Sequence, residues 1–217
     1  MSLSIGIYDL FAYTIPGFLY LYLVNEFLRL VGWRYLQLEN LPISNELLVG
    51  VLVALGAYLA GHVFDYFAYK FCFRLLTRYQ IVDASLDRLK KKYPELKIQF
   101  QPKDWDPLFV SIRQRNLEYS HVLDTFGASN IMLRNVSFSF FLFALLQIFN
   151  LFIEFQIATV IVAVGSLIIS WVAYLRSRMF YLWFFSDIYF ASLEYGTSLK
   201  KVIEYNWSKK EVSEKRK

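Results

Sequence analysis

Four stretches of the chain contain no Asp, Glu, Lys or Arg and are predominantly apolar: Leu10–Asn25, Leu47–Phe64, Val136–Ile153 and Phe155–Tyr174. A helix needs roughly 20 mostly apolar residues to cross the hydrocarbon core of a bilayer. Each stretch reaches or nearly reaches this length, and apolar flanks complete the shorter ones. None alternates polar and apolar residues as a barrel strand does, so we expect four membrane-spanning helices.

The segment between the second and third stretches is more polar, and its pattern predicts helices outside the membrane. We expect Asp65–Arg78 to continue the second helix and Val82–Tyr93 to form an amphipathic helix that Pro94 ends. Pro107–Asn135 is expected to form one long helix leading into the third span, with its proline in the first turn. An interruption of this helix at Gly127 is left open.

The chain after the fourth stretch is unusually apolar for a tail. Met179–Tyr205 is rich in aromatic and aliphatic residues, so we expect the fourth span to continue as one long helix. Such a surface outside the membrane must be covered, either by the helices of the insert or by another copy of the chain. We expect a homo-oligomer, because closed oligomers bury such surfaces by symmetry.

Composition agrees with a membrane protein, since 57% of the 217 residues are hydrophobic and 19% are aromatic. The predicted fold is all-α: an integral membrane four-helix bundle with a helical insert. Residues 1–69 hold the first two spans, 70–135 the insert, 136–175 a hairpin of spans three and four, and 176–217 a C-terminal helix and tail. The single cysteine, Cys72, excludes an intrachain disulfide.

Basic residues predict the orientation. Two lie between the first and second spans, twelve between Lys70 and Arg134, and nine between Arg176 and Lys217. Cytoplasmic loops carry the excess of Lys and Arg, so the insert and the C-terminus are expected to be cytoplasmic in a multi-pass protein of the inner (plasma) membrane. Basic residues at the span ends are expected to contact anionic membrane lipid.

One pair of residues suggests nucleic-acid chemistry. Arg115 and His121 fit the loose Arg-x5-His pattern of HEPN ribonucleases, in which arginine stabilises phosphate charge and histidine acts as acid or base. On a straight helix the two side chains lie roughly 120° apart, so they converge only across a bend or a dimer interface. Arg115 and Glu118 have the spacing of an ordinary surface pair, which is the competing interpretation.

A metal site is the second chemical candidate. His62 with Asp65 and Glu118 with His121 each have i, i+3 spacing, and two such pairs brought together could bind a divalent metal in a bundle. Bundle sites of this kind usually recruit more carboxylates, so we expect His62 to be an interfacial histidine and no metal to bind. The chain has no phosphate-binding glycine loop and no nucleophile elbow, so no cofactor is expected.

The basic residues of the insert are the expected surface for a cytoplasmic protein partner or an anionic signal, and nucleic acid is left open as a ligand. These residues are Arg88, Lys90, Lys91, Lys92, Arg113 and Arg115.

A small four-span chain with a basic cytoplasmic insert and an Arg-x5-His segment resembles membrane accessory and effector proteins of prokaryotic anti-phage defence. These are the membrane proteins that accompany type VI-B CRISPR loci and Kiwa-like systems. The resemblance implies an oligomeric inner-membrane effector or sensor, with a pore or a similar device, that perturbs membrane integrity or potential when its cytoplasmic part receives a signal. The alternatives are a membrane-bound HEPN-like nuclease using Arg115 and His121, and a structural subunit of a larger complex.

Overall fold

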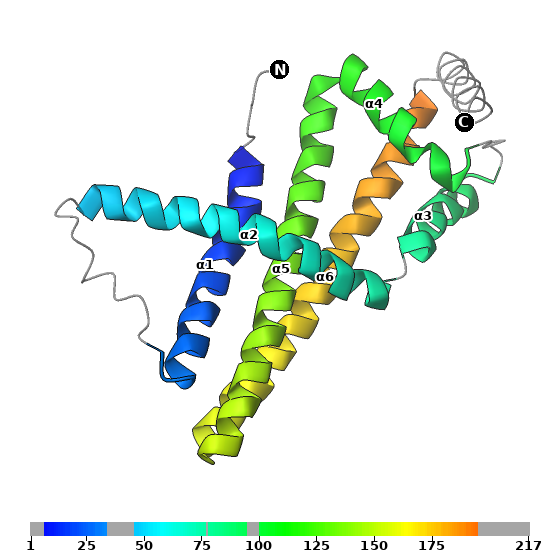
Figure 1. Cartoon of the computed structure of the whole chain (residues 1–217). Helices are drawn as coiled ribbons and strands as arrows, with labels where there is room; N and C mark the ends of the chain where they lie inside the picture. Colours follow the sequence, from blue (N-terminus) through cyan, green and yellow to red (C-terminus); the bar gives the residue numbers. More distant parts are fainter. Residues whose placement is uncertain (1–6, 34–45, 77, 95–99, 195–217) are drawn as a thin grey trace, which may run out of the picture. The chain divides into compact units, whose positions relative to one another are not determined.

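The computed structural model describes residues 7–33, 46–76, 78–94 and 100–194. All regular structure in these ranges is helical, which confirms the predicted all-α class (Figure 1). The elements are α1 (Ile7–Leu30), α2 (Glu46–Leu76), α3 (Arg78–Lys92), the short 3-10 helix η2 (Pro102–Asp104), α4 (Trp105–Arg115), α5 (Leu117–Ile153) and α6 (Ile157–Glu194).

Three described segments are long and apolar enough to cross a membrane: Leu47–Cys72 in α2, Leu117–Ile153 in α5 and Ile157–Leu193 in α6. Only 11%, 17% and 33% of their respective most apolar windows are buried, so most of these apolar side chains face outward. Lipid solvates such a surface, whereas in water it would drive association. The chain is therefore a membrane protein. Helix α1 is not among these three segments, and the count of four spans stays a prediction.

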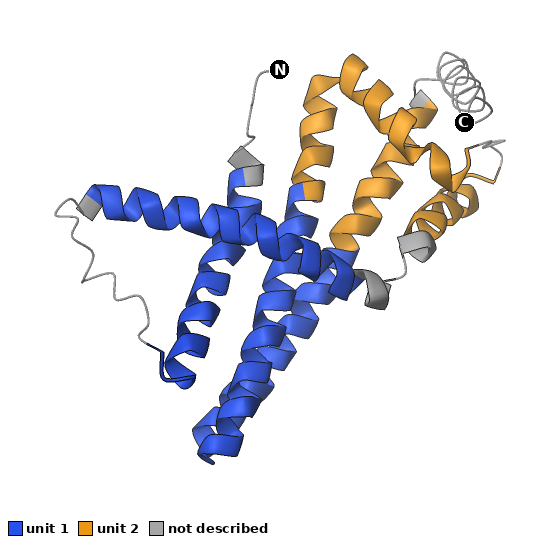
Figure 2. Cartoon of the chain, viewed as in Figure 1, with its two compact units in different colours: residues 1–75, 128–178 blue, residues 76–127, 179–217 orange. Residues whose placement is uncertain are grey.

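The chain divides into two compact units (Figure 2). The first unit comprises Met1–Leu75 and Ala128–Arg178, and the second comprises Leu76–Gly127 and Met179–Lys217. Helices α5 and α6 each contribute residues to both units. No break in either helix marks the point at which it passes from one unit to the other.

In the first unit, α1 and α2 cross at unusually close range. A Cβ atom on Gly17 would overlap the carbonyl oxygen of Ala57, and one on Gly61 would overlap that of Tyr13. Glycine therefore lets the two backbones touch, as small residues do at helix crossings in membranes. Figure 1 shows α2 lying across α1 rather than running alongside it.

Helices α5 and α6 form a hairpin in which only Glu154, Phe155 and Gln156 separate them, where the sequence predicts a tight turn. The hydroxyl groups of Ser137 and Ser170 donate to each other's carbonyl oxygens at 2.9 and 2.8 Å. Small residues recur on the buried face of α6, which allows this close packing. They are Thr159, Ala163, Ser166, Ser170, Ala173 and Ser177.

The second unit has its own apolar core, built from α3, α4, the start of α5 and the end of α6. Phe185 and Ile188 of α6 are buried there with Leu86, Leu108 and Ile112 from the insert. The Tyr189 hydroxyl, also from α6, donates to the Pro102 carbonyl oxygen at 2.9 Å. Of the two coverings considered for the apolar tail, its described part therefore uses the helices of the insert.

The long helix predicted for residues 107–135 is wrong in one respect, because it is broken at Asn116. This residue has an extended backbone (φ −137°, ψ 92°), and its side-chain oxygen accepts a hydrogen bond from the Tyr119 backbone N–H at 3.0 Å. Asparagine is among the preferred residues at the N-cap of a helix, because its side chain can accept a hydrogen bond from a backbone N–H of the first turn. Helix α4 therefore ends and α5 begins here. Gly127 does not interrupt α5.

Candidate functional site: an ion pair among the membrane helices

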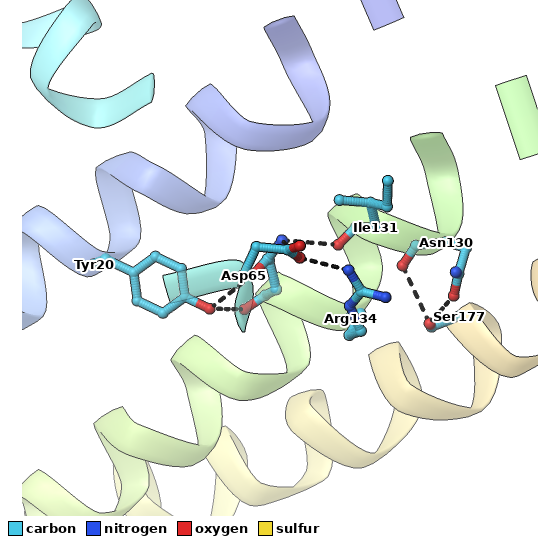
Figure 3. A network of polar contacts seen from close by, with 7 residues as sticks. Tyr20, Asp65, Asn130, Ile131, Arg134 and Ser177 are labelled. Atoms are coloured by element: carbon cyan, nitrogen blue, oxygen red, sulfur yellow. Dashed lines mark hydrogen bonds and ion pairs between the residues drawn. The ribbon is translucent and has the colours of Figure 1, made fainter. Parts of the chain in front are cut away.

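Opposite charges meet inside the first unit, on two helices that are long and apolar enough to cross a membrane. The Arg134 Nη2 atom on α5 lies 2.6 Å from the Asp65 Oδ1 atom on α2, and the side chains are only 11% and 21% exposed. Ionisable residues among membrane helices are costly, and they usually pair with each other and mark function. Figure 3 shows this pair at the centre of a polar network.

Asn135 connects the ion pair to α1. Its side-chain nitrogen donates to Asp65 Oδ1 at 2.8 Å and to the Ile131 carbonyl oxygen at 3.1 Å. The Tyr20 hydroxyl lies 2.9 Å from the Asn135 carbonyl oxygen and 3.2 Å from its Oδ1. Tyr20 and Asn135 are almost fully buried, so the network joins α1, α2 and α5 through side chains that are buried or mostly buried.

A second polar contact on α5 reaches α6. The Ser177 hydroxyl donates to Asn130 Oδ1 at 2.7 Å, and both side chains are buried (Figure 3). Asn130 lies one helical turn before Arg134 on α5. Polar contacts near the start of the membrane part of α5 thus reach all three of the other helices of the first unit.

Arg134 is not fully satisfied. Its guanidinium carbon lies 5.2 Å from the centre of the Tyr69 ring, within the range of a cation–π contact. Its Nε atom is buried and has no hydrogen-bond partner among the described residues. A buried donor without a partner costs about 1–3 kcal/mol. The unpartnered Nε atom therefore offsets part of the stability that the Asp65 contact contributes.

This arrangement is suited to holding helices together. The charges of Asp65 and Arg134 neutralise each other, so the pair is not a fixed charge that selects ions. Removing one partner of a buried pair costs about 3–5 kcal/mol, because the other charge is left uncompensated. The pair therefore contributes to holding α2 against α5, and loss of either charge should weaken this contact.

The predicted metal ligands take other roles in the first unit. The His62 ring stacks on Tyr13 with 3.7 Å between ring centres and meets the edge of Tyr58 at 4.5 Å. Asp65, one turn away, belongs to the ion pair with Arg134. Among the described residues, no three His, Cys, Asp or Glu side chains are grouped so as to hold a metal ion.

The predicted nuclease pair lies in the second unit, on two different helices. Arg115 is the last residue of α4, and His121 is in the second turn of α5 beyond the break at Asn116. Both side chains are exposed, as is Glu118. A bend between the two residues, which the pattern requires, is therefore present.

The predicted basic surface is exposed on the second unit, mainly in the last turns of α3. Arg88, Lys90, Lys91 and Lys92 are exposed there, and Arg113 is exposed on α4. The Lys92 Nζ atom also lies 5.3 Å from the centre of the Tyr93 ring and 5.8 Å from that of Phe190. Phe190 is on α6, so this contact ties the basic turn to that helix.

Sequence reasoning missed most of the polar network, although one signal was available. Asp65 directly follows the second charge-free stretch, and the Arg134–Asn135 doublet directly precedes the third. Opposite charges at the edges of two apolar stretches are natural partners. Tyr20, Asn130 and Ser177 carry no comparable signal.

Comparison with known proteins identifies no relative. No protein-family model matches the chain, and neither curated proteins nor solved structures gave a significant match.

Proposed function

We propose that this chain is a non-enzymatic effector or sensor of the inner membrane. In this proposal α1, α2, α5 and α6 lie in the membrane, and the second unit receives a partner or an anionic signal in the cytoplasm. The observation that carries the proposal is the continuity of α5 and α6, each of which supplies residues to both units. A signal that displaces the second unit acts directly on two membrane helices.

The lengths of these helices support the proposal. Helix α5 has 37 residues and α6 has 38, which at a rise of 1.5 Å per residue is about 55 Å each. The hydrocarbon core takes up only about 30 Å. Each helix therefore has the length to cross the membrane and still extend well beyond it as a rigid lever.

The basic turn of α3 is the proposed input surface. Lys90, Lys91 and Lys92 are all exposed, and Lys92 also contacts Phe190 near the end of α6. An acidic partner or a polyanion bound to the exposed lysines therefore acts next to a residue that packs on α6. Binding at this surface can therefore shift α6 through the contact between Lys92 and Phe190.

The proposed output is a change in membrane integrity or potential, as the resemblance to anti-phage membrane proteins implies. The apolar outer faces of α2, α5 and α6 are open to lipid and to further copies of the chain. A homo-oligomer assembled through such faces would place several copies of the same helices around one axis.

The test is a dye measurement of membrane potential in bacteria that express the chain, with and without phage challenge. We expect depolarisation on challenge, reduced in Lys90→Gln combined with Lys91→Gln. Arg29→Gln combined with Lys70→Gln removes the same charge from exposed residues outside the second unit, and it should respond like wild type. A steady potential in challenged cells that contain the inserted wild-type protein would refute the proposal.

A further inference from the structure

Three of the helix contacts of the first unit are held by different kinds of interaction. Backbones touch at Gly17 and Gly61 where α1 crosses α2, and α5 packs on α6 through small residues and paired serines. Helix α2 meets α5 through the Asp65–Arg134 ion pair, and Phe71 of α2 also packs on the rings of Phe138 and Phe141 of α5. Of these three contacts, the one between α2 and α5 includes a pair of charges, and hydration weakens that pair.

Along the chain, the ion pair lies close to two of the points at which the chain passes from one unit to the other. This unit ends on α2 at Leu75 and begins again on α5 at Ala128. Asp65 and Arg134 lie within a few helical turns of these two points. A movement of α5 that begins in the second unit therefore reaches Arg134 before it reaches the rest of the membrane helix.

We propose that the Asp65–Arg134 ion pair is a latch that holds α2 against α5 in the resting protein, and that its opening is the activating step. This inference rests on the proposed function and names its regulation. Asn135 strengthens the closed state, because it donates a second hydrogen bond to Asp65. The unpartnered Nε atom of Arg134 weakens it, because opening the latch lets water reach this donor.

Cys72 provides an independent structural readout of the latch. It is the single cysteine of the chain, it lies on α2 two turns beyond Asp65, and it is 1% exposed. Release of α2 from α5 should expose this thiol to water and so to N-ethylmaleimide. The labelling rate in native membranes then reports the fraction of protein with an open latch.

The variants are Asp65→Asn and Arg134→Gln, with the charge swap Asp65→Arg plus Arg134→Asp as the rescue. We expect each single variant to label Cys72 at least about tenfold faster than wild type, as loss of a buried pair implies. Glu26→Gln is the matched control, because it breaks the Glu26–Arg29 ion pair. Both residues of that pair lie on α1, so the pair does not join two helices. Circular dichroism checks that each variant remains folded.

Membrane potential measured in the same cells separates the outcomes. Fast Cys72 labelling and depolarisation without challenge in both single variants, each reversed by the swap, support the latch. Wild-type labelling rates in the single variants overturn it. Fast labelling with a normal potential, in cells whose wild type depolarises on challenge, also overturns it but leaves the proposed function standing. If challenged wild type never depolarises, the proposed function fails and the latch fails with it.

Discussion

The crossing of α1 and α2 makes a sharp prediction for two glycines of the same helix. Gly61 and Gly50 both lie inside α2. A Cβ atom on Gly61 would overlap the carbonyl oxygen of Tyr13, whereas one on Gly50 meets nothing within 4 Å. Substitution by alanine should therefore destabilise the protein at Gly61 and not at Gly50.

The magnitude follows from the kind of atom that Gly61 meets. A carbonyl oxygen of the backbone cannot rotate away as a side chain can, so the helices must separate, at a cost of about 1–3 kcal/mol. Alanine in a helix recovers about 0.5–1 kcal/mol relative to glycine. The net loss is up to about 2.5 kcal/mol, which for a chain of this size lowers Tm by up to about 10 °C. Gly50→Ala gains the same helix stability and has no such overlap to offset it.

Reaction of Cys72 with a thiol-reactive dye during heating measures this difference in detergent-solubilised protein. The thiol is buried in the folded state, so its labelling reports unfolding of α2. We expect Gly61→Ala to melt below wild type and Gly50→Ala to melt at or above it. Equal melting temperatures for the two variants would refute the close crossing of α1 and α2.

Three further predictions concern the hairpin, the second unit and the nuclease alternative. Ser137→Ala and Ser170→Ala should each cost about 0.5–1.5 kcal/mol in the same dye assay. Their combination should cost about the sum, because each hydroxyl donates to a backbone carbonyl that the other substitution keeps; wild-type stability of either single variant would contradict these bonds. Leu108→Ala, at a fully buried position, should cost about 2–5 kcal/mol and raise hydrogen exchange in the second unit, and unchanged exchange would contradict its core. His121→Ala, at an exposed position, should leave stability and the depolarisation response unchanged. Loss of an RNA-cleaving activity by orders of magnitude in that variant would instead favour the HEPN-like alternative.

The sequence predicts the positions of the helices well, because apolar length alone decides where a membrane helix forms. The second, third and fourth charge-free stretches lie within α2, α5 and α6, apart from two residues of the turn before α6. The continuation of α2 to Leu76 and of α6 past Met179 also follows from their apolar patterns.

Contacts between distant residues are not encoded in such local patterns. Asp65 and Arg134 are 69 residues apart, and their pairing depends on how α2 crosses α5. That crossing depends in turn on where glycine lets α2 approach α1, which periodicity does not reveal. The break at Asn116 was missed for another reason, because a capping side chain there outweighs an otherwise helical pattern.

Cysteine labelling of the hairpin tip and of the basic turn tests whether α5 and α6 cross the inner membrane with the second unit in the cytoplasm. In a Cys72→Ala background, Glu154→Cys and Lys91→Cys each place one thiol at an exposed position. We expect a maleimide that cannot cross the inner membrane to label Glu154→Cys in intact bacteria, and to label Lys91→Cys only after that membrane is broken. Labelling of both positions from the same side would contradict a membrane-crossing hairpin and the proposed function with it.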